Sequence, residues 1–166
     1  EEPQSEIYLF LLTSDENLIL PTIKSRAQQV HFPKKQAYLT ELLEKEGLIK
    51  SQANLVARFS FSLEEAEQQK KNATFFELAK FCDQFIERCQ SNLNRAYLEV
   101  TRLVSLADDK EKQSQAFRLM ELALEEQLRL SRSQQLLEKL SHARRMWKAN
   151  VSFQNALEYM VLSLES

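Results

Sequence analysis

The 166-residue chain is predicted to be mainly α-helical, with a short α/β segment at its N-terminal end. Two observations predict this fold class. The chain has one glycine and three prolines, and all three prolines lie before position 34, so the remainder lacks the residues that usually end helices and form tight turns. Apolar residues also recur at helical spacing through most of that remainder.

Residues 1–33 are expected to be the tail of a larger α/β domain. Residues 7–13 form a nearly continuous apolar run, which is typical of a strand buried on both faces of a parallel sheet. A helical turn around residues 18–24 and a second strand at 28–32 follow. Two strands cannot bury two sheet faces by themselves. Because the chain has no initiating Met and enters an apolar strand almost at once, we expect it to begin inside that domain.

Residues 34–71 are expected to form a three-helix module. Gly47 stands where a helix C-cap glycine belongs, and a second helix is expected at 51–59. A third helix begins at Ser62, which forms a capping-box pattern with Glu65. Before this glycine, apolar residues recur at helical spacing, namely Tyr38, Leu39, Leu42 and Leu43. So small a module needs a neighbour to pack against.

Residues 72–166 are expected to form an all-α domain of five helices. Thr74 with Glu77, and Asp108 with Glu111, fit capping boxes at the starts of the first and third of these helices. The apolar stripes favour helix-packing core over a cofactor site. They comprise Phe75, Leu78, Phe85 and Ile86; Leu93, Tyr97, Val100 and Leu103; Phe117, Met120, Leu124 and Leu128; Leu136, Leu140, Ala143 and Trp147; and Phe153, Ala156, Leu157, Met160 and Val161.

Several functions are disfavoured by composition and missing motifs. The net charge of −2 argues against a dedicated DNA-binding surface, which needs an excess of basic residues. A chain with one glycine cannot supply a glycine-rich phosphate loop, and His31 and His142 are too isolated to hold zinc. Cys82 and Cys89 lie two helical turns apart, about 10.5 Å, so we expect two buried thiols and no disulfide. No apolar run approaches the roughly 18 residues of a membrane span, and no signal peptide is visible.

Three stretches near the N-terminus resemble the last third of the AAA+ ATPase domain of bacterial DNA clamp-loader subunits. They are Glu1-Glu2-Pro3, the run from Ile7 to Ser14 and the run from Leu20 to Gln28. In that family a strand ends in a Thr-Ser, Thr-Thr or Thr-Asn pair called sensor 1. A later Ser-Arg-Cys signature supplies an arginine finger to the ATP site of the adjacent subunit. The resemblance implies that Thr13 is the sensor-1 residue, that Arg26 is the finger and that Ser25 positions it.

Arginine is suited to the role of a finger that acts on a bound nucleotide. A guanidinium group stays charged, and its planar fork matches phosphate oxygens. A finger supplied by a partner stabilises charge on the transferred phosphoryl group and is worth about 10³–10⁵ in rate in well-studied nucleotide hydrolases. The chain departs from the family pattern at Ala27, where the cysteine is expected, and at Lys24, where arginine is frequent.

The expected lid, residues 34–71, carries a further departure. The stretch from Phe61 to Ala66 resembles the lid sequence in which ATP-hydrolysing subunits have a sensor-2 arginine, and Glu64 stands at that position. A carboxylate there would repel a triphosphate. The delta-prime subunits of the family are similar in this respect, because they keep the finger and do not hydrolyse ATP.

The C-terminal helices resemble the end of the family's collar domain, which packs into a pentameric ring. Arg144, Arg145 and Trp147 are therefore interface candidates; a solvated helix face is the simpler alternative, and DNA contact is the least favoured.

The resemblance implies a subunit without activity of its own in this chain, accessory to the DNA-directed DNA polymerase III holoenzyme, a nucleotidyltransferase of the bacterial cytoplasm. ATP and Mg²⁺ would be bound by the neighbouring subunit. The implied partners are gamma or tau and delta subunits in a hetero-pentamer, with the sliding clamp and primed DNA reached through the complex. Two alternatives stay open: an ATP-hydrolysing gamma/tau-type subunit, or an unrelated helical interaction module.

Overall fold

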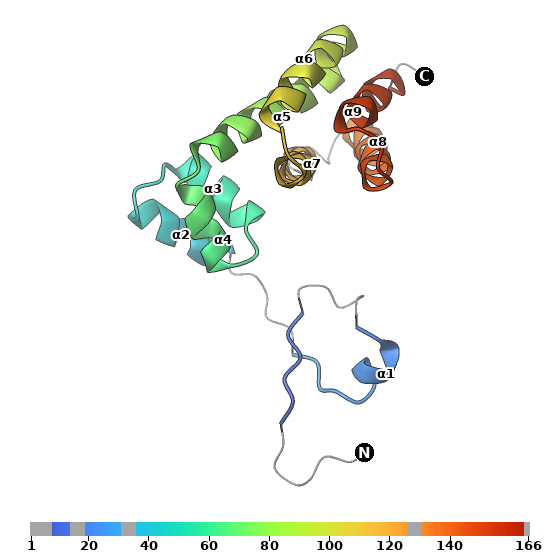
Figure 1. The fold of residues 1–166 in the computed structure, drawn as a ribbon. Helices are drawn as coiled ribbons and strands as arrows, with labels where there is room; N and C mark the ends of the chain where they lie inside the picture. The colour runs from blue at the N-terminus through green and yellow to red at the C-terminus, as the bar shows by residue number, and fades with distance from the viewer. Residues whose placement is uncertain (1–7, 14–18, 31–35, 126–130, 165–166) are drawn as a thin grey trace. The chain divides into compact units, whose positions relative to one another are not determined.

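The computed structural model describes residues 8–13, 19–30, 36–125 and 131–164, and these contain nine helices and no strand (Figure 1). The chain divides into two compact units, Glu1–Lys34 and Lys35–Ser166. The prediction of a mainly helical chain is confirmed.

The described part of the first unit contains one short helix, α1 (Pro21–Lys24). Pro21 occupies its first turn, where a fixed φ is favourable and the missing N–H is not needed. The two expected strands are not observed at residues 8–13 and 28–30; Ile7, His31 and Phe32 lie outside the described residues. A strand needs a hydrogen-bonded neighbour, and the apolar residues at 8–12 are 65–92% exposed here.

The second unit begins with the expected module of three helices, α2 (Gln36–Lys45), α3 (Lys50–Phe59) and α4 (Leu63–Lys70). α2 ends in a Schellman motif. Gly47 has φ +100°, its N–H donates to Glu44, and the Leu48 N–H donates to the Leu43 carbonyl at 3.1 Å. Lys70, at the end of α4, lies 2.7 Å from the Glu46 carboxylate and so ties the two helix ends together.

The cap of α4 confirms one capping-box prediction with a variation. The Ser62 hydroxyl accepts a hydrogen bond from the Glu65 N–H at 3.1 Å. The Glu65 carboxylate accepts in return from the N–H of Phe61, at 2.5 Å, one residue before the usual donor.

Five further helices follow, as expected: α5 (Ala73–Ser91), α6 (Leu93–Leu106), α7 (Lys110–Glu125), α8 (Ser131–Lys148) and α9 (Phe153–Leu162). α5 packs against α6 and α7, α8 packs against α7 and α9, and α9 returns to α6 (Figure 1). The helices therefore form a closed bundle, whose aromatic centre is Phe117 between Trp147 and Phe153, with ring centroids 5.5 and 5.3 Å away.

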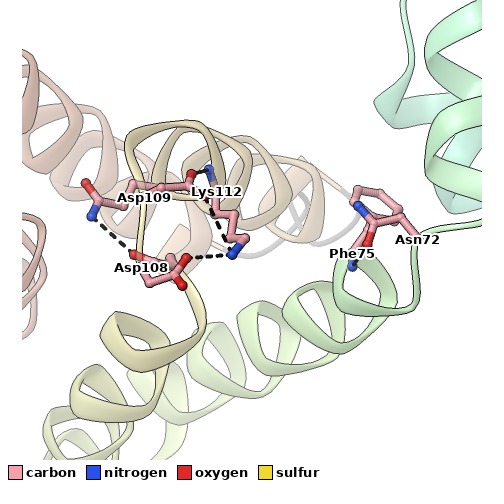
Figure 2. A network of polar contacts seen from close by, with 7 residues as sticks. Asn72, Phe75, Asp108, Asp109 and Lys112 are labelled. Carbon is pink, nitrogen blue, oxygen red and sulfur yellow. Dashed lines mark hydrogen bonds and ion pairs between the residues drawn. The ribbon is translucent and has the colours of Figure 1, made fainter.

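Two predicted caps lie one or two residues from the observed ones (Figure 2). The first residue of α5 is Ala73, and Asn72 caps it by accepting from the Phe75 N–H at 3.1 Å, so Thr74 lies inside the helix. Asp109 caps α7 by accepting from the Lys112 N–H at 2.8 Å, whereas Asp108 binds the Lys112 ammonium at 2.6 Å. Asn and Asp are both strong N-cap residues, so adjacent polar residues compete for the position.

The prediction for the two cysteines is confirmed. Cys82 and Cys89 are free and buried in the bundle. Burial raises the pKa of the Cys89 thiol to about 12 and raises that of Cys82 as well. Thiols of such high pKa are poor nucleophiles at neutral pH.

Candidate functional site

The predicted finger lies on the turn that ends α1. The Ser25 N–H donates to the Pro21 carbonyl at 3.0 Å, and the Arg26 N–H donates to the Ile23 carbonyl at 3.1 Å. The Ser25 hydroxyl donates to the Thr22 carbonyl at 3.1 Å. Ser25 thus binds the carbonyls of the first two residues of α1 and fixes the backbone from which Arg26 extends.

The surroundings of Arg26 are open to solvent. Arg26 is exposed, as are its neighbours Ser25, Ala27 and Gln28. The side chain of an exposed arginine extends several ångströms from the backbone and can bind an anionic group on another molecule in a bidentate manner. The geometry of the turn is therefore compatible with action on a partner.

Thr13, the predicted sensor-1 residue, lies in the same unit as Arg26. It is exposed and follows the apolar residues 8–12 in a stretch without regular secondary structure.

Glu64 is exposed in the first turn of α4, next to Glu65. Acidic side chains are stabilised there by the positive end of the helix dipole. Glu64 therefore has a local structural role and also presents negative charge at the position where the resemblance expects an arginine.

The three interface candidates of α8 have different surroundings. The Arg144 guanidinium donates to both carboxylate oxygens of Glu121 on α7, each at 2.7 Å. The Trp147 indole donates to the Gln113 side chain, also on α7, at 2.8 Å. Both side chains thus bind a helix of their own chain.

Arg145 is the exposed member of the three. Its guanidinium lies 3.4 Å from Nδ1 of His142, and the His142 ring packs on Tyr159 of α9 with ring centroids 5.4 Å apart. Arg145, His142 and Tyr159 therefore form an exposed polar and aromatic face that spans α8 and α9.

Two arginines that join the three-helix module to the bundle were not predicted from the sequence. Arg118 of α7 lies with its guanidinium carbon 3.6 Å from the ring centroid of Phe61 and 4.5 Å from that of Phe59. Arg58 of α3 donates to the Leu122 carbonyl of α7 at 3.0 Å. Arg58 and Leu122 are 64 residues apart, and Arg118 has Ser114, Gln115 and Glu121 as helix neighbours, so no local pattern in the sequence marked either arginine.

The described residues contain no group of three or more histidine, cysteine or acidic side chains that could hold a metal ion. A cavity of about 30 Å³ lies in the bundle, with room for about one water molecule, far less than a nucleotide needs. It is lined by Cys89, Gln90, Leu93, Gln135, Leu136 and Leu164. None of the helices in the described part of the chain combines the length and apolar character that crossing a membrane requires.

Residues 1–36 match the family model described as DNA polymerase III, delta subunit. The matched stretch contains the apolar residues 8–12 and the α1 turn with Ser25 and Arg26. No curated protein and no solved structure matches the chain. The match supports a relationship of this segment to the clamp-loader-type subunits of DNA polymerase III.

Proposed function

We propose that the chain belongs to a delta-prime-type subunit of a bacterial DNA polymerase III clamp loader, acting in the cytoplasm without hydrolysing ATP itself. The observation that carries this proposal is the family match over residues 1–36, which includes the turn where Arg26 is exposed. In this role the subunit helps to load the sliding clamp onto primed DNA.

Arg26 acts in trans, on ATP and Mg²⁺ bound by a neighbouring subunit. Its guanidinium stabilises the negative charge that develops on the transferred phosphoryl group. Ser25 is the positioning residue, because its hydroxyl binds the Thr22 carbonyl and holds the turn. Thr13 occupies the sensor-1 position in the same unit. ATP hydrolysis then depends on correct assembly of the two subunits.

Glu64 favours the non-hydrolysing type of subunit over a gamma/tau type. It places a carboxylate in the first turn of α4, where an ATP-hydrolysing lid would need a cation. We therefore expect the full-length protein to bind ATP weakly or not at all; tight binding measured by calorimetry would favour the gamma/tau alternative.

The bundle α5–α9 assembles with the collar domains of gamma or tau and delta subunits into a hetero-pentamer. The face of Arg145, His142 and Tyr159 is the favoured contact surface, because Arg144 and Trp147 already bind α7 of their own chain.

The proposal is tested by reconstituting the full-length protein with its partner subunits, sliding clamp and primed DNA. Arg26→Ala is expected to abolish hydrolysis at the one ATP site that it serves and to depress clamp loading, while the complex stays assembled. Lys24→Ala is the matched control, since it removes a nearby cation from the same turn. Unchanged ATP hydrolysis in an intact Arg26→Ala complex would rule out the finger.

A further inference from the structure

The three-helix module and the bundle each contribute an arginine that contacts the other across their junction. Arg58 extends from α3 to α7, where it donates to the Leu122 carbonyl at 3.0 Å and lies 3.6 Å from Glu125. Arg118 extends in the opposite direction, from α7 to the corner between α3 and α4, where it lies 3.8 Å from Glu65. Residues 118, 122 and 125 share one face of α7, so both contacts lie on the same side of this helix.

The contacts of Arg118 restrict its orientation. Its guanidinium lies over the rings of both Phe61 and Phe59, and its side chain is 19% exposed. Partial burial lowers the pKa of Arg118, but an arginine remains protonated in proteins, so its partners have to stabilise the partly buried charge. Arg118 has to stack on the two rings and pair with Glu65 at the same time. These contacts can form together in one position of α7 relative to the corner between α3 and α4.

The remaining connection between the module and the bundle consists of a short linker and of packed apolar side chains. Only Lys71 and Asn72 separate α4 from α5, and the Phe59 ring packs edge-to-face on Phe75 at the start of α5, with centroids 4.8 Å apart. The buried apolar side chains of the module and the bundle belong to one cluster. Because apolar attraction is non-directional, the angle between the two parts depends on directional contacts. Both arginine contacts join the module to α7, a helix other than the one that follows the linker, so they can oppose a change in that angle.

We propose that Arg58 and Arg118 form an arginine latch that fixes the angle between the module α2–α4 and the bundle α5–α9. Opening the latch lets the module rock about the linker and the Phe59–Phe75 contact. The inference uses only contacts within residues 36–125 and does not depend on the proposed function.

The test measures a distance across the junction in the full chain. Ser51→Cys on α3 and Thr101→Cys on α6 place spin labels at exposed positions of the module and the bundle. Cys82 and Cys89 are buried with raised pKa values and are not expected to react under native conditions. Double electron–electron resonance should give one narrow distance distribution in the labelled parent.

Arg58→Ala combined with Arg118→Ala should broaden that distribution, with helix content preserved by circular dichroism. Arg118→Lys keeps the charge but loses the planar group, so it should broaden the distribution to a smaller extent. Arg95→Ala, which removes an exposed arginine of α6, is the matched control and should leave the distribution narrow.

An unchanged narrow distribution in the folded double variant would overturn the latch. Should the double variant lose its helix content, Arg118→Lys and Glu65→Gln take its place, because each removes one latch contact while retaining most of the side chain. Narrow distributions in both of these variants would equally overturn the proposal.

Discussion

Arg144 of α8 holds Glu121 of α7 through a single guanidinium nitrogen, which lies 2.7 Å from both carboxylate oxygens. The two side chains are 30% and 24% exposed, so water competes only partly with this charge-assisted pair. The pair joins two helices that are 23 residues apart in sequence at this point. It gives Arg144 a structural role within the bundle.

Arg144→Ala is expected to lower the free energy of unfolding by about 1–3 kcal/mol, because it leaves a partly buried carboxylate without its partner. Urea unfolding followed by circular dichroism measures the change. Arg145→Ala is the matched control: it removes an exposed arginine from the same helix and should stay within about 0.5 kcal/mol of the parent. Equal losses in the two variants would contradict a structural role for Arg144.

The start of α7 allows a test of which aspartate is the cap. Asp109→Ala should cost about 1 kcal/mol, because the Lys112 N–H loses its acceptor. Asp108→Ala should cost less, since it removes only a surface ion pair with the Lys112 ammonium. Thermal unfolding of both variants measures the order, and a larger loss for Asp108→Ala would show that the cap is assigned to the wrong residue.

The Asp108–Lys112 pair also predicts a pH dependence. The hydrogen bond from Lys112 lowers the pKa of Asp108 below its ordinary value of 3.8, and the same bond raises the pKa of Lys112 above 10.5. For the carboxyl group, the stabilisation is present above pH 3.8 and is lost as the pH falls through the lowered pKa. For the amine, it is present below pH 10.5 and is lost as the pH rises through the raised pKa.

The difference in melting temperature between the parent and Asp108→Asn should therefore be constant through neutral pH and shrink at both extremes. The Asp108 and Lys112 side chains are 66% and 33% exposed, so the difference should also shrink in high salt. A difference that peaks in acid would contradict the assigned pair.

Asn150 ends α8 in a left-handed conformation, with φ +67°. The Val151 N–H donates to the Met146 carbonyl at 3.1 Å, and the Asn150 N–H donates to Trp147 at 3.0 Å, which is a Schellman ending. Asn150→Ala should lower the free energy of unfolding by about 1 kcal/mol, because a Cβ is disfavoured there unless a short polar side chain compensates. Asn150→Gly should be neutral or slightly stabilising. Chemical denaturation compares the two, and equal stability of both variants would argue against the left-handed conformation.

The helices from residue 36 onward could be predicted from sequence because their signals are local. Apolar spacing and the glycine at position 47 lie within a few residues of the structure that they specify. The observed caps of α5 and α7 differ from the predicted ones by two residues and by one residue. Neighbouring polar residues can each accept the same kind of backbone hydrogen bond, so local spacing does not choose between them. The strand predicted at residues 7–13 is not observed at the described residues 8–13, because a strand depends on a paired neighbour, which is not a local property.

The sequence by itself determined that the chain is mainly helical and which face of each helix is apolar. It also contains the motif around Arg26 that suggests an action of this residue on a partner subunit. Only the tertiary structure decided which arginines are bound within the chain. Arg58 meets Leu122 across 64 residues, and Arg144 meets Glu121 across 23, so no local pattern reports either contact. The charge of an arginine is evident from sequence, but its partner is set by how the helices pack.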